Sequence, residues 1–259
     1  MDYRIAIPSF NRPQILIDKT LKLLDKHGIP FNKIDLFLEN QEQYDNYIEV
    51  LEKDNRFWDI DIHITDTLGI GMKRNYIRYY YVYETNYINI LSIDDDIECI
   101  MKMDNEIDNL DEFIKNAFIE TKKRGYNLWG VSAYHNPFFL SDKISINLKY
   151  ICGAFFGLII DRSKVLLQTN YNHYEDFQFS ILHFCRDKGV VRFNMVAIKT
   201  KYFGEGGINE SYGGLANRKK DMEIAGKRFV EEYPTYSRLI EKKYGYDIRL
   251  RYTAKPPVN

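Results

Sequence analysis

The sequence has 259 residues, of which 45% are hydrophobic, so it can bury the core of one large α/β domain or two small ones, and we expect one. Its 36 Lys and Arg nearly balance its 37 Asp and Glu, which excludes a strong overall attraction for nucleic acid but allows a local basic groove. The three cysteines, Cys99, Cys152 and Cys185, form no CxxC pair, which argues against a disulfide framework or a zinc site.

The N-terminal region shows no targeting pattern. Residues 1–10 enter a strand-like run directly and lack the regions of a signal peptide, and no stretch reaches about 18 uninterrupted apolar residues. We therefore expect a soluble, cytoplasmic protein that does not bind a membrane. The 21 tyrosines could stack on sugars or bases, but a composition rich in Ile, Asn, Lys and Tyr also follows from an AT-rich genome, and we favour that explanation.

The first part of the chain alternates strand and helix patterns. Residues 3–8 predict a buried strand, and 14–28 have apolar positions on a helical period that ends at Gly28. The pattern continues with strands at 33–40, 60–66 and 87–97 and helices at 42–54 and 74–85. This alternation predicts an α/β fold with a mostly parallel central sheet and helices on its faces.

The second part is less regular. It predicts a helix at 110–125, a strand at 128–136, strand, close turn and strand within 150–165, a helix at 173–189 and a strand at 190–203. Residues 204–221 contain five glycines and few apolar residues, so we expect a mobile loop there. From Met222 onward the pattern predicts a closing helical segment with a short polar end.

Polar and glycine-containing turns follow the predicted strands. Ser9, Glu39, residues 69–75 and residues 94–96 all lie at or just after strand ends. Ligands of parallel sheets collect at the carboxyl ends of the strands. The sequence therefore predicts one candidate site made from four separate turns.

Three consecutive carboxylates, Asp94 to Asp96, follow an apolar strand pattern. Carboxylates beside a core are unfavourable unless water, cations or a metal compensates them. Mg²⁺ and Mn²⁺ prefer a few carboxylates together with phosphate oxygens and water, so the Asp-x-Asp spacing could hold a nucleotide diphosphate. By itself the triplet fits a solvated acidic turn better, but its place in a β/α series reverses that preference.

Charged residues also open two predicted helices. Lys73 and Arg74 follow a glycine turn, where they could face phosphate or form a solvated first turn. Arg12, in the first β-α turn, is ambiguous in the same way. Glu175 and Asp176 could supply a general base for an acceptor hydroxyl, or they could cap their helix. The local sequence leaves both alternatives open.

Taken in order, these segments resemble the GT-A glycosyltransferases, a nucleotide-sugar-dependent class that includes family 2 enzymes. The resemblance spans roughly residues 3 to 205 and is carried by RIAIPSFNRP, LFLEN, GIGMKRN, LSIDDDI, CGAFFGLIIDR and YEDFQ. It implies a Rossmann-like sheet flanked by helices. Within the class, the first, third and fourth segments are most similar to the TET/JBP-associated glycosyltransferases, which include the enzyme thought to glucosylate hydroxymethyluracil in base J synthesis.

On the donor side, the resemblance implies a nucleotide pocket at the strand ends. The matching positions are Pro8, Ser9, Arg12, Glu39 (near the base or ribose), Lys73, Arg74 and Asn75. Asp94 is expected at the ribose and, with Asp96, at a Mn²⁺ or Mg²⁺ ion that bridges the diphosphate of a UDP-sugar. Asp95 belongs to the same cofactor site, but its role stays unassigned.

On the acceptor side, the resemblance implies a close-packed turn at Gly153 and Ala154. Asp176, with Glu175 next to it, is expected as the base of an inverting displacement. The glycine-rich loop 204–214, followed by Arg218, Lys219 and Lys220, could close over donor and acceptor so that the cations neutralise the departing diphosphate. An idle surface loop has the same composition, and we leave the two alternatives open.

One departure from the class concerns the metal. Many GT-A enzymes supply a late histidine as a further ligand, whereas the last histidine here is His183. Either Glu205, Asn209 or water would serve instead, or metal binding is weaker than in the type members of the class. The QxxRW signature of processive family 2 synthases is also missing, which argues against polysaccharide synthesis at a membrane.

The resemblance implies one GT-A domain over residues 1–259. Its nucleotide-sugar-binding half is 1–100, its acceptor-side half is 101–205, and a mobile loop with a C-terminal helix occupies 204–259. The expected reaction moves a sugar from UDP-glucose or a similar donor to a hydroxymethylated pyrimidine in phage or viral DNA, in the cytoplasm of the host. The alternatives are a glycan or protein acceptor, a sugar-nucleotide pyrophosphorylase, and a non-catalytic DNA- or glycan-binding module.

Overall fold

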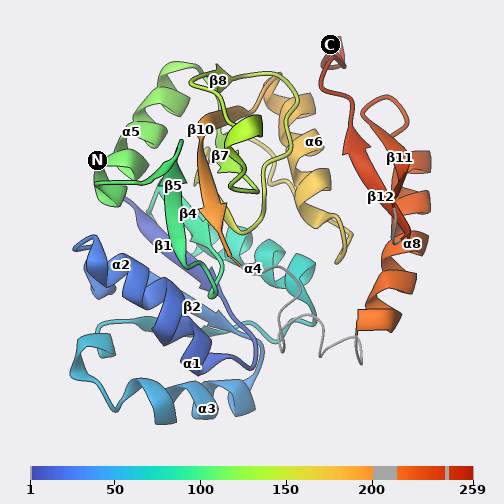
Figure 1. The fold of residues 1–259 in the computed structure, drawn as a ribbon. Helices are drawn as coiled ribbons and strands as arrows, with labels where there is room; N and C mark the ends of the chain where they lie inside the picture. The colour runs from blue at the N-terminus through green and yellow to red at the C-terminus, as the bar shows by residue number, and fades with distance from the viewer. Residues whose placement is uncertain (1, 201–214, 243–244, 259) are drawn as a thin grey trace.

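Helices cover both faces of one long mixed sheet, and a helix with a two-stranded hairpin follows at the C-terminus (Figure 1). The computed structural model describes residues 2–200, 215–242 and 245–258. In spatial order, the strands of the sheet are β3 (Asp61–Ile64), β2 (Ile34–Leu38), β1 (Arg4–Pro8), β4 (Asn89–Ile93), β9 (Phe155–Ile159), β7 (Leu128–Ser132), β10 (Val191–Lys199), β5 (Cys99–Lys102) and β6 (Asn105–Glu106), and β8 (Ile144–Ser145) pairs with β10.

Strands β1 to β4 run parallel to one another, so their carboxyl ends lie along one edge of the sheet. β9 is antiparallel to β4 and β7, and its amino end therefore joins the same edge. β10 is parallel to β7 and antiparallel to β5. Most strands thus share one direction, and the predicted α/β fold with a mostly parallel sheet is confirmed.

The two faces of the sheet carry separate hydrophobic clusters. Ile5 and Ala6 are neighbours in β1 but belong to different clusters, because successive strand side chains point to opposite faces. The helices α1 (Pro13–Leu16), η1 (Ile17–Leu21), α2 (Lys22–Lys26), α3 (Gln41–Leu51) and α5 (Leu110–Lys123) pack on the Ile5 face. The helices α4 (Ile70–Tyr83) and α6 (Glu175–Asp187) pack on the Ala6 face, and α8 (Leu215–Glu232) joins the same cluster through Phe229, which contacts Tyr171 and Tyr174 before α6.

Burial on both faces explains why β1 and β2 have nearly continuous apolar sequences. Every residue of these two strands is buried. The two charged residues among them pair with each other: the guanidinium of Arg4 donates to Asp35 at 2.6 Å. The core therefore accepts two charges in its strands without leaving either unpaired.

Some predicted elements differ in the structure. The segment 150–165 contains one strand, β9, since residues 150–154 form a turn whose backbone contacts charged side chains of α4 and α6. Helix α4 begins at Ile70, directly after Gly69, and not at Arg74 as predicted, so Lys73 and Arg74 both lie inside the helix. The short strands β5, β6 and β8 have too few residues to show a period.

The C-terminal segment is also a correction. Helix α8 ends at Glu232, and an antiparallel hairpin of β11 (Ser237–Lys242) and β12 (Gly245–Leu250) follows where a helix was expected. Pro234 explains the change, because proline lacks the amide that a helix interior requires. In the part of the chain that the structure describes, we find no helix with the length and apolar character needed to span a bilayer.

Candidate active site

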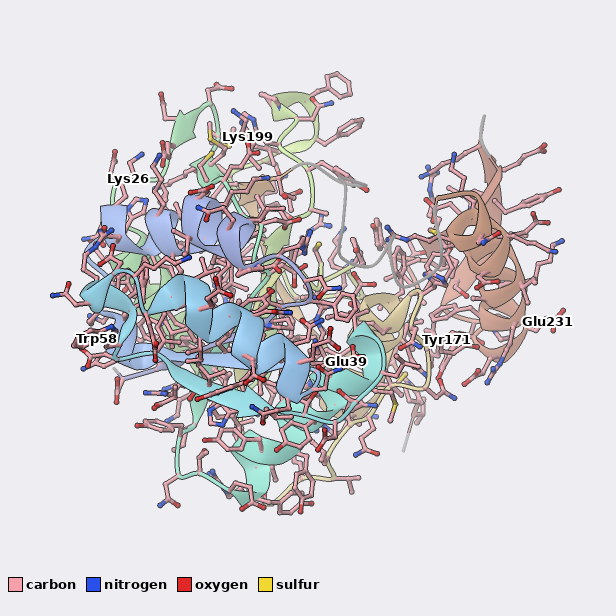
Figure 2. The ribbon with its side chains drawn as sticks, turned by 90° about the horizontal axis from the view of Figure 1, so that it is seen from below. Lys26, Glu39, Trp58, Tyr171, Lys199 and Glu231 are labelled. Carbon is pink, nitrogen blue, oxygen red and sulfur yellow. The ribbon has the colours of Figure 1, made fainter. Side chains whose placement is uncertain are left out.

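The carboxyl ends of β1, β2 and β4 bring the predicted donor-side residues to one edge. Pro8 ends β1 opposite Phe37, and the amide of Ser9 extends the pairing by donating to the carbonyl of Phe37 at 3.1 Å. Glu39 is half-buried just after β2. Figure 2 shows Glu39 well separated from Trp58. The amide of Asp94 donates to the carbonyl of Ala154 at 3.0 Å, which ties the end of β4 to the turn before β9.

Asp95 is completely buried and serves as an anchor. Its carboxylate accepts hydrogen bonds from the Ser9 hydroxyl and the Arg12 guanidinium. The Tyr47 hydroxyl lies 2.6 Å from Ser9 Oγ and accepts from the Arg12 amide at 3.0 Å. Burial raises the pKa of Asp95 to about 7, although Arg12 opposes this change. Asp95 therefore holds the first β-α turn against β4 and does not reach solvent.

Asp94 and Asp96 flank Asp95 and are only partly buried. Their side chains are 28% and 20% exposed. Asp94 Oδ1 accepts from Arg74 Nη2 at 2.7 Å, and Asp96 Oδ2 accepts from Arg12 Nη1 at 3.2 Å. Burial raises the pKa of Asp94, and the Arg74 guanidinium opposes that change. Two partly exposed carboxylates therefore remain at the sheet edge.

Two threonines fix the backbone of this acidic turn. The Thr20 hydroxyl donates to the carbonyl of Asp94 at 2.7 Å and accepts from the amide of Ile97 at 3.0 Å. The Thr200 hydroxyl donates to the carbonyl of Asp96 at 2.9 Å. The carboxylates are thus presented by a turn whose conformation is fixed from both sides.

Arg74 joins the donor and acceptor sides. Its guanidinium contacts Glu175 and donates to Asp94 at 2.7 Å and to the carbonyl of Gly153 at 2.8 Å. A Cβ at Gly153 would overlap this guanidinium, so a larger residue there would displace the Arg74 side chain. Burial raises the pKa of Glu175, while Arg74 opposes that rise. Arg74 and Glu175 are therefore engaged with each other in the interior.

Asp176 lies one residue further along α6 and is half-buried. Its Oδ2 accepts from the Tyr150 hydroxyl at 2.6 Å and from the Gly153 amide at 3.1 Å. Because the two donors come from the turn before β9, they fix the orientation of the carboxylate. Of the two carboxylates predicted here, Asp176 is partly exposed, whereas Glu175 is buried.

The remaining predicted side chains have different surroundings. Lys73 Nζ donates to the carbonyl of Ser9 at 2.7 Å, and burial lowers the pKa of this lysine to about 8. Asn75 instead bonds the backbone of Thr169, through its amide nitrogen at 2.7 Å and its oxygen at 2.9 Å. Arg218, in the first turns of α8, is half-buried and helps burial to lower the pKa of His173 to about 4.

A divalent metal fits the donor set formed by Asp94 and Asp96. Within residues 2–200, 215–242 and 245–258, no group of three or more His, Cys, Asp or Glu side chains could form a complete protein cage. Mg²⁺ and Mn²⁺ do not need one, since they are commonly held by one or two carboxylates, substrate phosphates and water. The predicted ligands Glu205 and Asn209 and the loop 204–214 lie outside the described residues.

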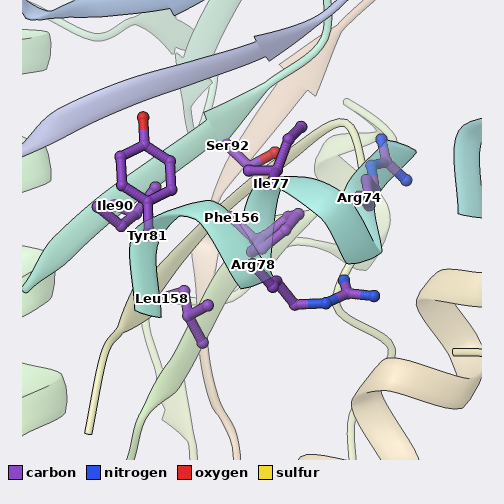
Figure 3. A pocket seen from close by; sticks show the side chains of 8 residues that line it. All are labelled: Arg74, Ile77, Arg78, Tyr81, Ile90, Ser92, Phe156 and Leu158. Carbon is purple, nitrogen blue, oxygen red and sulfur yellow. The ribbon is translucent and has the colours of Figure 1, made fainter. Parts of the chain in front are cut away.

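A small cavity lies behind Arg74, between α4 and the sheet. Figure 3 shows its lining, which comprises Arg74, Ile77, Arg78, Tyr81, Ile90, Ser92, Phe156 and Leu158. Its volume is about 10 Å³, which is room for about one water molecule. A sugar or nucleotide does not fit in this cavity.

Several supporting residues could not be recognised from the sequence. Tyr47 lies on an apolar helix face and is indistinguishable from a core residue there, yet its hydroxyl bonds the first β-α turn. Thr20, Tyr150 and Thr200 likewise carry no local signal. Each hydrogen-bonds to a residue at least 26 positions away in the sequence, so only the folded structure reveals its role.

Comparisons with known proteins identify the fold. No family model and no curated protein matches the chain. Among solved structures, the mannosyltransferase PcManGT from Pyrobaculum calidifontis, in complex with GDP-Man and Mn²⁺, has a TM-score of 0.55 at 10% identity, over 90% of this chain and 64% of that one. S. aureus TarS 1-349 has a TM-score of 0.52 at 11% identity, over 89% of this chain and 66% of that one.

A third similar structure is mannosyl-3-phosphoglycerate synthase from Rubrobacter xylanophilus. Its TM-score is 0.52 at 10% identity, and the match covers 99% of this chain and 87% of that one. The chain spans slightly less than two thirds of PcManGT and of TarS 1-349. At these identities the likeness concerns the fold, and this chain has the GT-A glycosyltransferase fold.

Proposed function

We propose that this protein is a metal-dependent glycosyltransferase that moves a sugar from a nucleoside diphosphate to a hydroxyl acceptor with inversion. The observation that carries the proposal is that Arg74, which bonds Asp94 beside Asp96, also lies within electrostatic range of a third carboxylate, Asp176, held by the turn before β9. PcManGT shares this fold and was solved with GDP-Man and Mn²⁺. That complex supports the choice of donor class and of metal.

In this proposal Asp96 is the principal metal ligand and Asp94 the second. An ion held by these two carboxylates would supply Lewis-acid stabilisation of the charge on the departing diphosphate. The residues proposed to line the nucleotide are Pro8, Ser9, Arg12, Glu39 and Lys73, with Gly153 on the acceptor side and Arg218 at the departing diphosphate. Asp95, Arg74 and Asn75 hold neighbouring groups in place, as their buried hydrogen bonds indicate.

The chemistry needs one base. The acceptor oxygen forms a bond to the anomeric carbon while the bond from that carbon to the diphosphate oxygen breaks, and the electron pair of the broken bond stays on the nucleoside diphosphate. Asp176 takes the proton of the acceptor hydroxyl. Glu175 acts through Arg74, because its carboxylate is buried against that guanidinium. Attack from the face opposite the diphosphate inverts the anomeric configuration.

For the acceptor we propose a hydroxymethylated pyrimidine in DNA, with UDP-glucose as the first donor to test. The ordered motifs that resemble the TET/JBP-associated glycosyltransferases support this choice. Tyr134 supports a ring-shaped acceptor in general, because it is 65% exposed and lies within electrostatic range of Asp176. The nearly balanced net charge favours a glycan or protein acceptor as the second candidate. The proposed location is the cytoplasm.

The first test measures donor binding and turnover. We expect UDP-glucose or GDP-mannose to bind by calorimetry with Mn²⁺ and to lose binding in EDTA. Asp96→Ala should weaken metal-dependent donor binding by about 10-fold or more, since it removes a charged ligand. Asp176→Asn should keep donor binding and lower sugar transfer by about 10²-fold to 10⁴-fold, since it removes the base.

The control is Asp59→Ala, which removes an exposed carboxylate beside Trp58, far from Glu39 (Figure 2). It should leave donor binding and transfer unchanged. If no nucleoside diphosphate binds in the presence of Mn²⁺, the glycosyltransferase proposal is wrong. Mass spectrometry of DNA containing hydroxymethyluracil or hydroxymethylcytosine then tests the acceptor. If neither DNA gains mass, the proposed acceptor is wrong and a glycan or protein becomes the proposed acceptor.

A further inference from the structure

The Arg12 guanidinium bridges two of the three acidic residues. Nη2 donates to Asp95 Oδ1, and Nη1 donates to Asp96 Oδ2 at 3.2 Å. The two carboxylates differ in exposure, because the Asp95 side chain is 0% exposed and the Asp96 side chain is 20% exposed. One end of the guanidinium is therefore anchored in the interior, and the other end reaches the edge where a ligand arrives.

Other contacts make Asp95 a fixed attachment point. Its second oxygen accepts from the Ser9 hydroxyl, and the backbone amide of Arg12 donates to the Tyr47 hydroxyl at 3.0 Å. Burial lowers the pKa of Arg12, but attraction to the three carboxylates of residues 94–96 outweighs this and raises it. Arg12 thus stays charged at every physiological pH, and only its contact with Asp96 is exposed to exchange.

We propose that Arg12 is a positioning residue that exchanges partners during donor binding. A metal ion that binds Asp96 competes with Nη1 for the same carboxylate, so Nη1 turns to an oxygen of the donor diphosphate while Nη2 remains on Asp95. This inference rests on the proposed function, since it requires a metal and a nucleoside diphosphate at Asp96. It assigns Asp95 the role of holding Arg12 ready for that exchange.

Simple electrostatics favours the exchange. A divalent cation at Asp96 repels the nearby guanidinium, whereas a diphosphate on the same ion attracts it. The planar fork of arginine can keep one donor on a carboxylate and place another on a phosphate oxygen. Lysine has a point charge without this fork, so it can replace the charge of Arg12 but not the two simultaneous contacts.

The test uses two binding measurements whose changes have opposite signs. In Arg12→Met, Mn²⁺ alone should bind about fivefold more tightly by electron paramagnetic resonance titration, because a competing cation is gone. UDP or GDP with saturating Mn²⁺ should bind about 10-fold or more weakly by calorimetry, because a charged hydrogen bond to phosphate is lost. Arg12→Lys should restore Mn²⁺ affinity to the wild-type value and only part of the nucleotide affinity.

The matched control is Arg56→Met, which removes an exposed arginine that pairs with Asp25 and Asp54. It should change neither affinity. Parallel losses of metal and nucleotide affinity in Arg12→Met, or no change in either, would show a purely structural role and overturn the inference while leaving the proposed function intact. If the wild-type protein binds no nucleoside diphosphate with Mn²⁺, the proposed function and this inference are both wrong.

Discussion

Lys73 and Arg74 are adjacent in α4, yet their surroundings give their charges different properties. Lys73 donates to a neutral carbonyl, that of Ser9, whereas Arg74 contacts the carboxylates of Asp94 and Glu175. Burial lowers the pKa of Lys73, and in Arg74 the carboxylates outweigh burial so that its pKa is raised. The lysine is therefore the cation at this site whose charge can change near neutral pH.

This difference predicts a pH dependence of stability. Burial lowers the pKa of Lys73 to about 8, below its ordinary value of 10.5, so between these values the unfolded chain binds more protons than the folded protein. The free energy of unfolding contributed by Lys73 therefore rises from pH 8 to pH 10.5. Urea denaturation across this window should show the wild type gaining stability relative to Lys73→Met.

The control for Lys73 is Lys53→Met, whose lysine side chain is 68% exposed. Its stability should follow the wild-type pH profile throughout. Parallel profiles for Lys73→Met and the wild type would contradict a depressed lysine pKa. Comparing variants, and not the wild type alone, removes the contribution of the many tyrosines that also titrate in alkaline solution.

At the scale of elements, the start of α4 is set by close packing against the segment before α6. Gly69 has a φ of 82°, and a Cβ there would lie 2.8 Å from the side-chain oxygen of Asn172. A Cβ at Gly71 would overlap the carbonyl of Tyr171. The glycines that suggested a phosphate-facing turn thus let two segments approach closely, and this approach places Lys73 and Arg74.

Two helical glycines predict opposite effects. Gly71→Ala should lower the free energy of unfolding by about 1–3 kcal/mol, since its Cβ meets rigid backbone. Gly226→Ala in α8 should raise it by about 0.4–1 kcal/mol, since alanine has less freedom in the unfolded chain. A Cβ at Gly226 would lie 3.5 Å from its nearest neighbouring atoms, which is an ordinary van der Waals contact. Chemical denaturation measures both, and equal effects would refute the packing argument.

At the scale of the whole molecule, α8 and its hairpin are held against the segment that precedes α6. Phe229 is fully buried there and contacts the rings of Tyr171 and Tyr174. The Tyr171 hydroxyl donates to Glu232 at 2.7 Å. This packing brings the first turns of α8, with Arg218, next to the segment that enters α6.

Phe229 and Ile224 form a matched pair for testing this packing. Phe229→Ala should lower the free energy of unfolding by about 3–5 kcal/mol, because it removes a buried ring. Ile224 lies on the same helix but is 61% exposed, so Ile224→Ala should change stability by no more than about 0.5 kcal/mol. Urea denaturation followed by circular dichroism measures both. A small effect of Phe229→Ala would mean that α8 contributes little to overall stability.

Much of the architecture was predictable from local sequence. The strands β1, β2 and β4 were found because both of their faces are buried, which requires nearly continuous apolar residues whatever the rest of the chain does. The convergence of Ser9, Glu39 and Asp94 followed from parallel topology alone. The hairpin β11–β12 was not predicted. Its residues follow the helical pattern of α8 after only a short break around Pro234, so the whole segment was assigned to a helix.

By itself, then, the sequence determined the α/β class and which turns meet at the sheet edge, since strand periodicity and chain direction are local properties. Only the tertiary structure decided the partner of each charge. Asp95 bonds Ser9 across 86 residues, and Arg74 meets Glu175 across 101 residues. Such pairs depend on how distant segments pack, so three adjacent and chemically identical carboxylates became one buried anchor and two partly exposed candidate ligands.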